Sequence, residues 1–175
     1  MEEVLINPMC LVGMTTYHTK NIPGNVGISI GSLYALQEEL TYKLTLTCPL
    51  GTGVTPLAEL VANMIEYENL RLRKGTNNMN YYEEFVLVGW YVMGAEASSD
   101  GKLFNELSKA FELRGASYSL HYLIGKSVEP EPKLFKGGQQ IKYKLQIDPL
   151  QKYCVDALSL QQSNKESAVV KTLNK

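Results

Sequence analysis

The most hydrophobic run of the chain, Phe85 to Tyr91, restricts its fold more than any other feature. The run reads Phe-Val-Leu-Val-Gly-Trp-Tyr and contains no charged residue. A continuous apolar strand of this kind is usually buried on both faces, so further layers must cover both sides of the sheet that contains it. Neither this run nor any other apolar run approaches the roughly 18 residues that a membrane span requires, so we expect no membrane as partner.

Two earlier segments alternate between side-chain types with the period of a β-strand. In the first, at 26–31, branched apolar residues alternate with glycine and serine. The second, at 41–48, is expected to place one set of residues on one face: Tyr42, Leu44, Leu46 and Cys48. We expect Tyr34–Leu40 to be the hairpin connection between the two strands, and Pro49–Gly53 to end the second.

Three segments carry helix signals. Asn7 can cap a helix whose first residue is Pro8 and which runs to about Lys20. Thr55-Pro56 starts the longest helix, which is expected to end at Gly75. The third helix is expected over 99–114. Its apolar side is formed by Leu103, Phe104, Leu107, Ala110 and Phe111.

After the third helix the sequence predicts strands at 117–124 and 140–147, separated by a long, exposed loop that holds Pro130 to Gly138. In the last strand Ile141, Tyr143, Leu145 and Ile147 should share a buried face. The element order β-α-β-β-α-β-α-β-β predicts an α/β fold, a mixed β-sheet flanked by helices. We expect one domain over 1–148 and a C-terminal tail over 149–175 that is partly helical or disordered.

The charge and the cysteine content argue against several classes of protein. The chain has 17 basic and 18 acidic side chains and a net charge of −1, without the basic excess of a nucleic-acid binder. Its three widely spaced cysteines favour buried thiols in a reducing compartment over a disulfide framework. The acidic start, Glu2-Glu3, is unlike a signal peptide, so we expect a cytoplasmic protein.

Motifs for catalysis are scarce. The chain has two histidines, His18 and His121, which lie far apart in sequence and in no metal-ligand pattern. No nucleophile elbow and no phosphate-binding Gly-Lys-Ser/Thr loop is present. We therefore expect no catalytic residue, no metal and no cofactor.

Three segments, taken in order, resemble the MPN family. Val4-Leu5-Ile6-Asn7-Pro8 is similar to its strand-His-Pro-helix opening. Val26 to Ser32 is similar to its hydrophobic-Gly-x-x-x-Gly-Ser strand, and Val86 to Tyr91 to its Val-x-Gly-Trp-Tyr strand. The resemblance covers about residues 4–147 and implies an MPN (JAB1/MPN-like) fold.

The same resemblance implies a lost metal site. In active members, a His-x-His-Pro sequence and a later Ser and Asp position a zinc ion, with a Glu on an earlier strand as the general base. Here the two His positions hold Val92 and Gly94, and the Asp position holds Asn105. The remaining positions also hold residues of other kinds: Ala95 for Pro, Lys102 for Ser, and Gly24 or Asn25 for Glu. A metal-dependent deubiquitinase is accordingly the minor alternative.

Members without the metal site are paired scaffold subunits of the proteasome lid, the COP9 signalosome and translation initiation factor 3. Residues 94–106 and Lys136-Gly137-Gly138 are most similar to the f subunits of initiation factor 3. The resemblance implies another MPN subunit as partner, within a large complex that contacts the small ribosomal subunit indirectly. The expected interface residues are Met9, Val12, Thr16, Val155 and Leu158.

Overall fold

The computed structural model describes residues 3–22, 24, 27–72, 85–95, 101–124 and 131–145. Its helices are α1 (Pro8–Asn21), α2 (Leu57–Leu72) and α3 (Gly101–Glu112). Its strands are β1 (Glu3–Ile6), β2 (Ile28–Glu38), β3 (Thr41–Thr52), β4 (Phe85–Ala95), β5 (Tyr118–Ile124), β6 (Lys133–Lys136), β7 (Gln139–Ile141) and β8 (Lys144–Leu145).

The chain divides into a compact unit, Met1–Leu145, and a second unit, Gln146–Lys175. Every described residue belongs to the first unit. The predicted domain end at residue 148 lies close to this division. The predicted tail at 149–175 lies outside the described residues.

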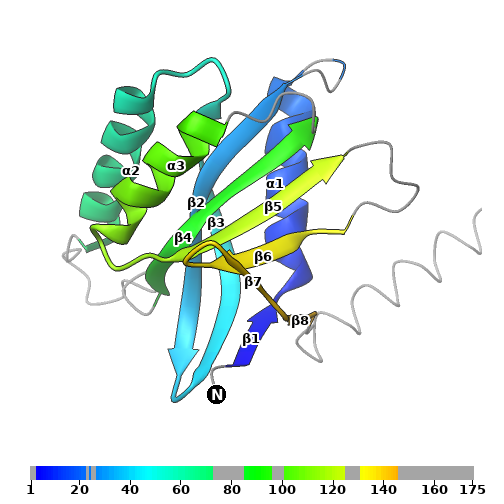
Figure 1. Cartoon of the computed structure of the whole chain (residues 1–175), viewed down its shortest axis with the longest axis vertical. Coiled ribbons are helices and arrows are strands. Elements are labelled where there is room, and N and C mark those ends of the chain that lie inside the picture. Colours follow the sequence, from blue (N-terminus) through cyan, green and yellow to red (C-terminus); the bar gives the residue numbers. More distant parts are fainter. Residues whose placement is uncertain are drawn as a thin grey trace, which may run out of the picture. The chain divides into compact units, whose positions relative to one another are not determined.

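The strands of the described part form one mixed sheet in the order β7-β6-β5-β4-β2-β3-β1-β8. β1 runs parallel to β3 and to β8, and β4 runs parallel to β5. The β2–β3, β2–β4, β5–β6 and β6–β7 pairs are antiparallel. Helix α1 covers one face of the sheet, and α2 and α3 cover the other (Figure 1), so the predicted α/β class with a flanked mixed sheet is confirmed.

The two faces of the sheet carry separate hydrophobic cores. On one face Cys10 and Met14 of α1 pack against residues such as Leu33 and Tyr91. On the other face α2 and α3 lie side by side and pack over Trp90 and Val92. The central strand β4 thus contributes to both cores, as its uninterrupted apolar sequence predicts.

Helix α1 starts where the sequence predicts. Asn7 has an extended backbone, and its side-chain Oδ1 accepts a hydrogen bond from the Met9 N–H at 3.0 Å. Pro8 occupies the first turn, where its missing N–H costs no helical hydrogen bond.

The predicted hairpin connection at Tyr34–Leu40 is wrong. Strand β2 continues to Glu38, and only Glu39 and Leu40 form the turn, with Glu39 at a φ of 54°. Tyr34 and Ala35 pair with β3 on one side and with β4 on the other. Because β2 is central and both of its faces are covered, its second half shows no polar–apolar alternation.

The predicted end of the next strand at Pro49 is also wrong, since β3 extends to Thr52. Proline is accepted because β1 pairs only with Thr41–Leu44, so the stretch of β3 around Pro49 needs no backbone donor toward β1. Pro49 itself lies opposite Gly31 of β2.

Strand β3 does not place its alternating apolar residues on a single face. Tyr34 pairs with Leu46 and Ala35 with Leu44, so Thr45 is an extra residue, a β-bulge. A bulge reverses the sidedness of the residues that follow it. Leu44 therefore joins the core under α1, and Leu46 joins the core under α2 and α3.

The stretch after β5 also differs from the prediction. The supposed exposed loop at 130–138 contains strand β6, whose Leu134 is fully buried. Gly137 and Gly138 form the turn into β7, both with positive φ. The predicted strand at 140–147 is two short strands within the described residues. Its Leu145 is 59% exposed, and Ile147 lies outside those residues.

Candidate functional site

The three positions that would hold a metal in active MPN domains are not arranged as a ligand set. Val92 is fully buried on β4, in the core under α2 and α3. Gly94 lies near the end of β4, and Asn105 lies on the exposed side of α3. Valine and glycine side chains offer no donor atom to zinc, and one amide oxygen cannot hold the ion.

The surroundings of Gly94 show why no ligand fits there. Its φ is +137°, and a Cβ at this position would lie 2.2 Å from the Gly27 carbonyl oxygen and 2.8 Å from Cε1 of His18. His18 is buried, and its Nδ1 lies 3.0 Å from Oγ of Ser29. The backbone of Gly27 and the ring of His18 thus occupy the space that a side chain at Gly94 would need.

The remaining positions of the resembled metal site do not supply zinc ligands either. Gly24 is described and has no side chain, whereas Asn25 lies outside the described residues. Lys102 is exposed in the first turn of α3. In the described part of the chain no three His, Cys, Asp or Glu side chains converge as a metal site, and the residues of the resembled site do not fit zinc.

The outer face of α1 is the first candidate surface. Met9 and Val12 are each 51% exposed, and Thr16 is exposed on the same side, one turn further on. Cys10, Met14 and His18 face inward and are buried. The structure therefore brings these three predicted interface residues onto one side of the helix. Val155 and Leu158 lie outside the described residues.

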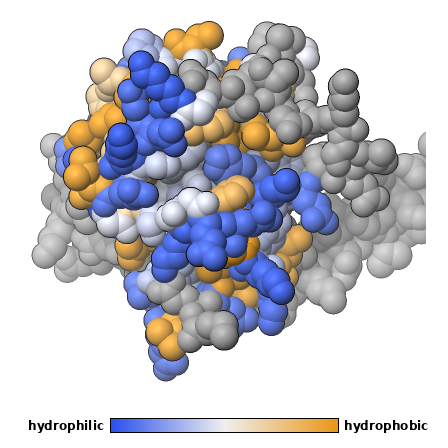
Figure 2. Space-filling model, viewed as in Figure 1, coloured by the Kyte–Doolittle hydropathy of each residue, from blue (hydrophilic) through white to orange (hydrophobic). Residues whose placement is uncertain are grey.

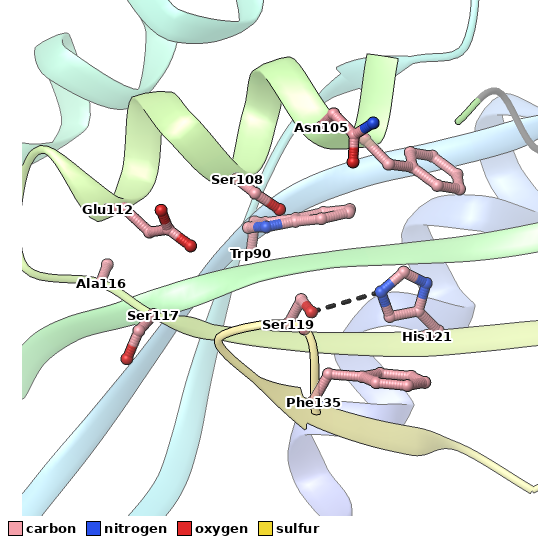
Figure 3. Close-up of a pocket in the computed structure, with 11 residues that line it drawn as sticks. Trp90, Asn105, Ser108, Glu112, Ala116, Ser117, Ser119, His121 and Phe135 are labelled. Carbon is pink, nitrogen blue, oxygen red and sulfur yellow. Dashed lines mark hydrogen bonds between the residues drawn. The ribbon is translucent and has the colours of Figure 1, made fainter. Parts of the chain in front are cut away.

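A cavity of about 200 Å³ between α3 and β5 is the second candidate (Figure 3). Its α3 wall carries Asn105, Ser108 and Glu112, which follow one another at helical spacing. The opposite wall carries Ser117, Ser119 and His121, which follow one another at strand spacing. The cavity is thus bounded by two facing rows of hydrogen-bonding groups.

Aromatic rings close one end of this cavity. The His121 ring lies 5.2 Å from the Trp90 ring, 5.7 Å from Phe104 and 4.9 Å from Phe135, edge to face with each. Burial lowers the pKa of His121 to about 4, so the imidazole is neutral near pH 7. Its Nε2 lies 3.3 Å from Oγ of Ser119.

This cavity was not predicted from the sequence, although its polar residues recur there at regular spacing. The spacing of Asn105, Ser108 and Glu112 puts a polar row on α3. Ser117, Ser119 and His121 alternate with the apolar residues of β5 and look like a solvent-facing set. Only the packing of α3 over β5 turns two ordinary polar rows into facing walls.

Hydrophobic residues are also exposed away from α1 and from the cavity. Figure 2 shows hydrophobic residues in small groups between hydrophilic ones. Single exposed residues such as Val54 and Leu113 are normal for a protein surface. Among the described helices, none has both the length and the apolar character needed to cross a bilayer.

Comparisons with known proteins add little to this geometry. No model of a protein family matches the chain, and no curated protein matches it significantly. A search of solved structures finds a JAB1/MPN domain protein from Archaeoglobus fulgidus. It has 10% sequence identity and a TM-score of 0.44, and the match covers 85% of this chain and 100% of that one. Similarity at this level assigns no activity, ligand or partner to the chain.

Proposed function

We propose that this chain is a non-catalytic MPN scaffold subunit of translation initiation factor 3. The outer face of α1 would bind another MPN subunit. The observation that supports this most directly is the exposure of Met9 and Val12, 51% each, on one side of a helix whose other side is buried. Apolar side chains that recur on one exposed helix face can be buried by a partner helix.

The absence of catalysis is part of the proposal. Val92 and Gly94 replace the two histidines of active members, and the space at Gly94 is occupied by His18 and Gly27. Restoring one ligand would therefore not rebuild a site, because a metal requires several donors at about 2 Å. Selection on such a chain would act on its surfaces.

The choice of initiation factor 3 rests on the local sequence around 94–106 and at Lys136-Gly137-Gly138. In such a complex the chain would support assembly of the 43S pre-initiation complex. Its contact with the small ribosomal subunit would pass through other subunits, since a net charge of −1 does not favour direct RNA binding. The proteasome lid and the COP9 signalosome are the alternative assemblies.

Affinity purification of the tagged full chain tests the proposal. We expect other initiation factor 3 subunits, among them an MPN subunit, together with small-subunit ribosomal proteins. The double variant Met9→Glu/Val12→Glu should lose the MPN partner while keeping its circular dichroism spectrum. Val54→Glu is the matched control because Val54 is an exposed apolar residue away from α1, 93% exposed.

Three results would count against the proposal in different ways. Recovery of lid or signalosome subunits would move the scaffold role to those assemblies. Retention of the partner by the α1 double variant would show that α1 is not the interface. Stoichiometric zinc together with ubiquitin-cleaving activity in the purified chain would replace the scaffold role with the hydrolase alternative.

A further inference from the structure

The cavity between α3 and β5 lies on the opposite face of the sheet from α1, so the proposed partner interface does not account for it. The volume of the cavity is about 200 Å³. Pockets that hold drug-sized ligands are larger, at roughly 300–1,000 Å³. A cavity of this size suits one side chain or one small polar molecule. The hydroxyl, amide and carboxylate groups on its two walls favour a ligand with several hydrogen-bond donors.

Glu112 sets the charge of the site. It is the charged residue among the described groups that line the cavity, and its side chain extends from α3 toward it (Figure 3). It is exposed to solvent, and among the described residues no cation forms an ion pair with its carboxylate. A carboxylate in the last turn of a helix also meets the negative end of the helix dipole, which is unfavourable. A bound cation would offset this unfavourable interaction with the helix dipole.

The aromatic end of the cavity favours a planar cation. Trp90 and Phe104 lie with ring centroids 5.5 Å apart at the border of the cavity. Cations are attracted to the faces of aromatic rings, and guanidinium groups also stack on them. Trp90 is only 2% exposed, so the partly exposed Phe104 is the ring of this pair that such a group would meet. His121, neutral near pH 7 because burial lowers its pKa to about 4, adds no opposing charge.

We propose that this cavity binds a guanidinium group, as carried by an arginine side chain. A guanidinium has five N–H donors in one plane, whereas an ammonium is a compact point charge. In this cavity Glu112 and Ser108 would accept from one side, Ser119 would accept from the other, and the plane would lie against the aromatic end.

The single tryptophan of the chain, Trp90, borders the cavity, so its fluorescence reports on binding directly. The probe is Nα-acetyl-arginine amide, and the matched control ligand is Nα-acetyl-citrulline amide, which has the same shape without the charge. We expect a saturable fluorescence change with the arginine probe and at least roughly tenfold weaker binding of the citrulline probe. Equal binding of the two, or no saturable change with the arginine probe, would overturn the proposal.

Two variants locate the site. Glu112→Gln should weaken binding of the arginine probe by roughly tenfold or more, and Ser108→Leu should abolish it by filling the cavity. Glu59→Gln, which changes an exposed carboxylate on α2, should leave binding unchanged. Unchanged affinity in both Glu112→Gln and Ser108→Leu, with both variants folded by circular dichroism, would refute the assignment.

The same assay distinguishes the two possible sources of the guanidinium group, a polypeptide and a small molecule. Tighter binding of the blocked arginine than of free L-arginine indicates a residue within a polypeptide, and the reverse order indicates a small molecule. Either order supports the guanidinium site. The Met9→Glu/Val12→Glu variant should bind the arginine probe normally. The guanidinium site and the α1 interface are therefore tested independently of each other.

Discussion

The ring of Tyr91 on β4 packs directly over the backbone of Gly31 on the neighbouring strand β2. The two residues are paired across the sheet, and a Cβ on Gly31 would lie 2.2 Å from Cε1 of Tyr91 and 2.5 Å from the carbonyl oxygen of Cys48. One of these neighbours is backbone, so the crowding cannot be relieved by a side-chain rotation alone.

Gly31→Ala is therefore expected to lower the free energy of unfolding by about 3 kcal/mol or more. Denaturant titration measures the change. Gly101→Ala is the matched control, because a Cβ at Gly101 meets no atom within 4 Å and alanine favours the helix there. Equal stability of the two variants would contradict the close packing of Tyr91 on β2.

The hydroxyl of Tyr91 is buried without a hydrogen-bond partner among the described residues. Removing a buried polar group that has no partner recovers part of its desolvation penalty. We expect Tyr91→Phe to raise the free energy of unfolding by about 1 kcal/mol. Tyr143→Phe should instead lower it by about 1 kcal/mol, because the Tyr143 hydroxyl donates to the Pro132 carbonyl. A destabilised Tyr91→Phe variant would reveal a partner for that hydroxyl.

Arg71 on α2 forms an ion pair with Glu68 of the same helix and also links the helix to the start of β4. Arg71 donates from Nε and from an Nη to the two Glu68 oxygens at 2.8 and 2.9 Å, and also donates to the Phe85 carbonyl. Both side chains are nearly buried, so Arg71→Met would leave the Glu68 carboxylate without a cation, with the Tyr34 hydroxyl as its remaining partner. The expected loss is about 3 kcal/mol of unfolding free energy.

A second ion pair provides the control for that measurement. Lys43 and Glu38 form a pair at 3.1 Å with side chains 38% and 64% exposed. Lys43→Met should change stability by no more than about 1 kcal/mol, because exposed pairs contribute little. Similar losses of unfolding free energy in Arg71→Met and Lys43→Met would argue against a buried ion pair at Arg71.

The stability of the domain should depend on pH through His121. Burial lowers the pKa of the folded imidazole from 6.5 to about 4, so the unfolded chain binds more protons between these values. The contribution of His121 is fully present above about pH 6.5 and is lost as the pH falls toward 4. Chemical unfolding at a series of pH values measures the slope, and NMR titration gives the pKa directly.

His121→Phe keeps a ring between Trp90 and Phe135 but removes the titrating group. This variant should lose most of the slope of stability against pH in the same window. An NMR pKa near 6.5 for His121, or an unchanged slope in His121→Phe, would show that the imidazole is not desolvated as the geometry indicates.

Local chemistry alone determined several elements of this protein. The cap at Asn7 and the proline after it start α1, since their effect depends only on the first turn of the helix. The apolar run from Phe85 determined β4 and its burial on both faces, because no other placement removes so much apolar surface from water. The chemical character of Val92 and Gly94 likewise excluded them as metal ligands.

Tertiary structure decided what depends on pairing between distant segments. The bulge at Thr45 appears only when β3 pairs with β2, and it sends Leu44 and Leu46 to opposite cores that a strict period of two would place together. The cavity beside Trp90 exists only because α3 packs over β5 and brings Glu112 toward Ser119. A pattern along one segment records which residues can be buried. Which face they occupy, and what they meet there, depends on register and packing with the other segments.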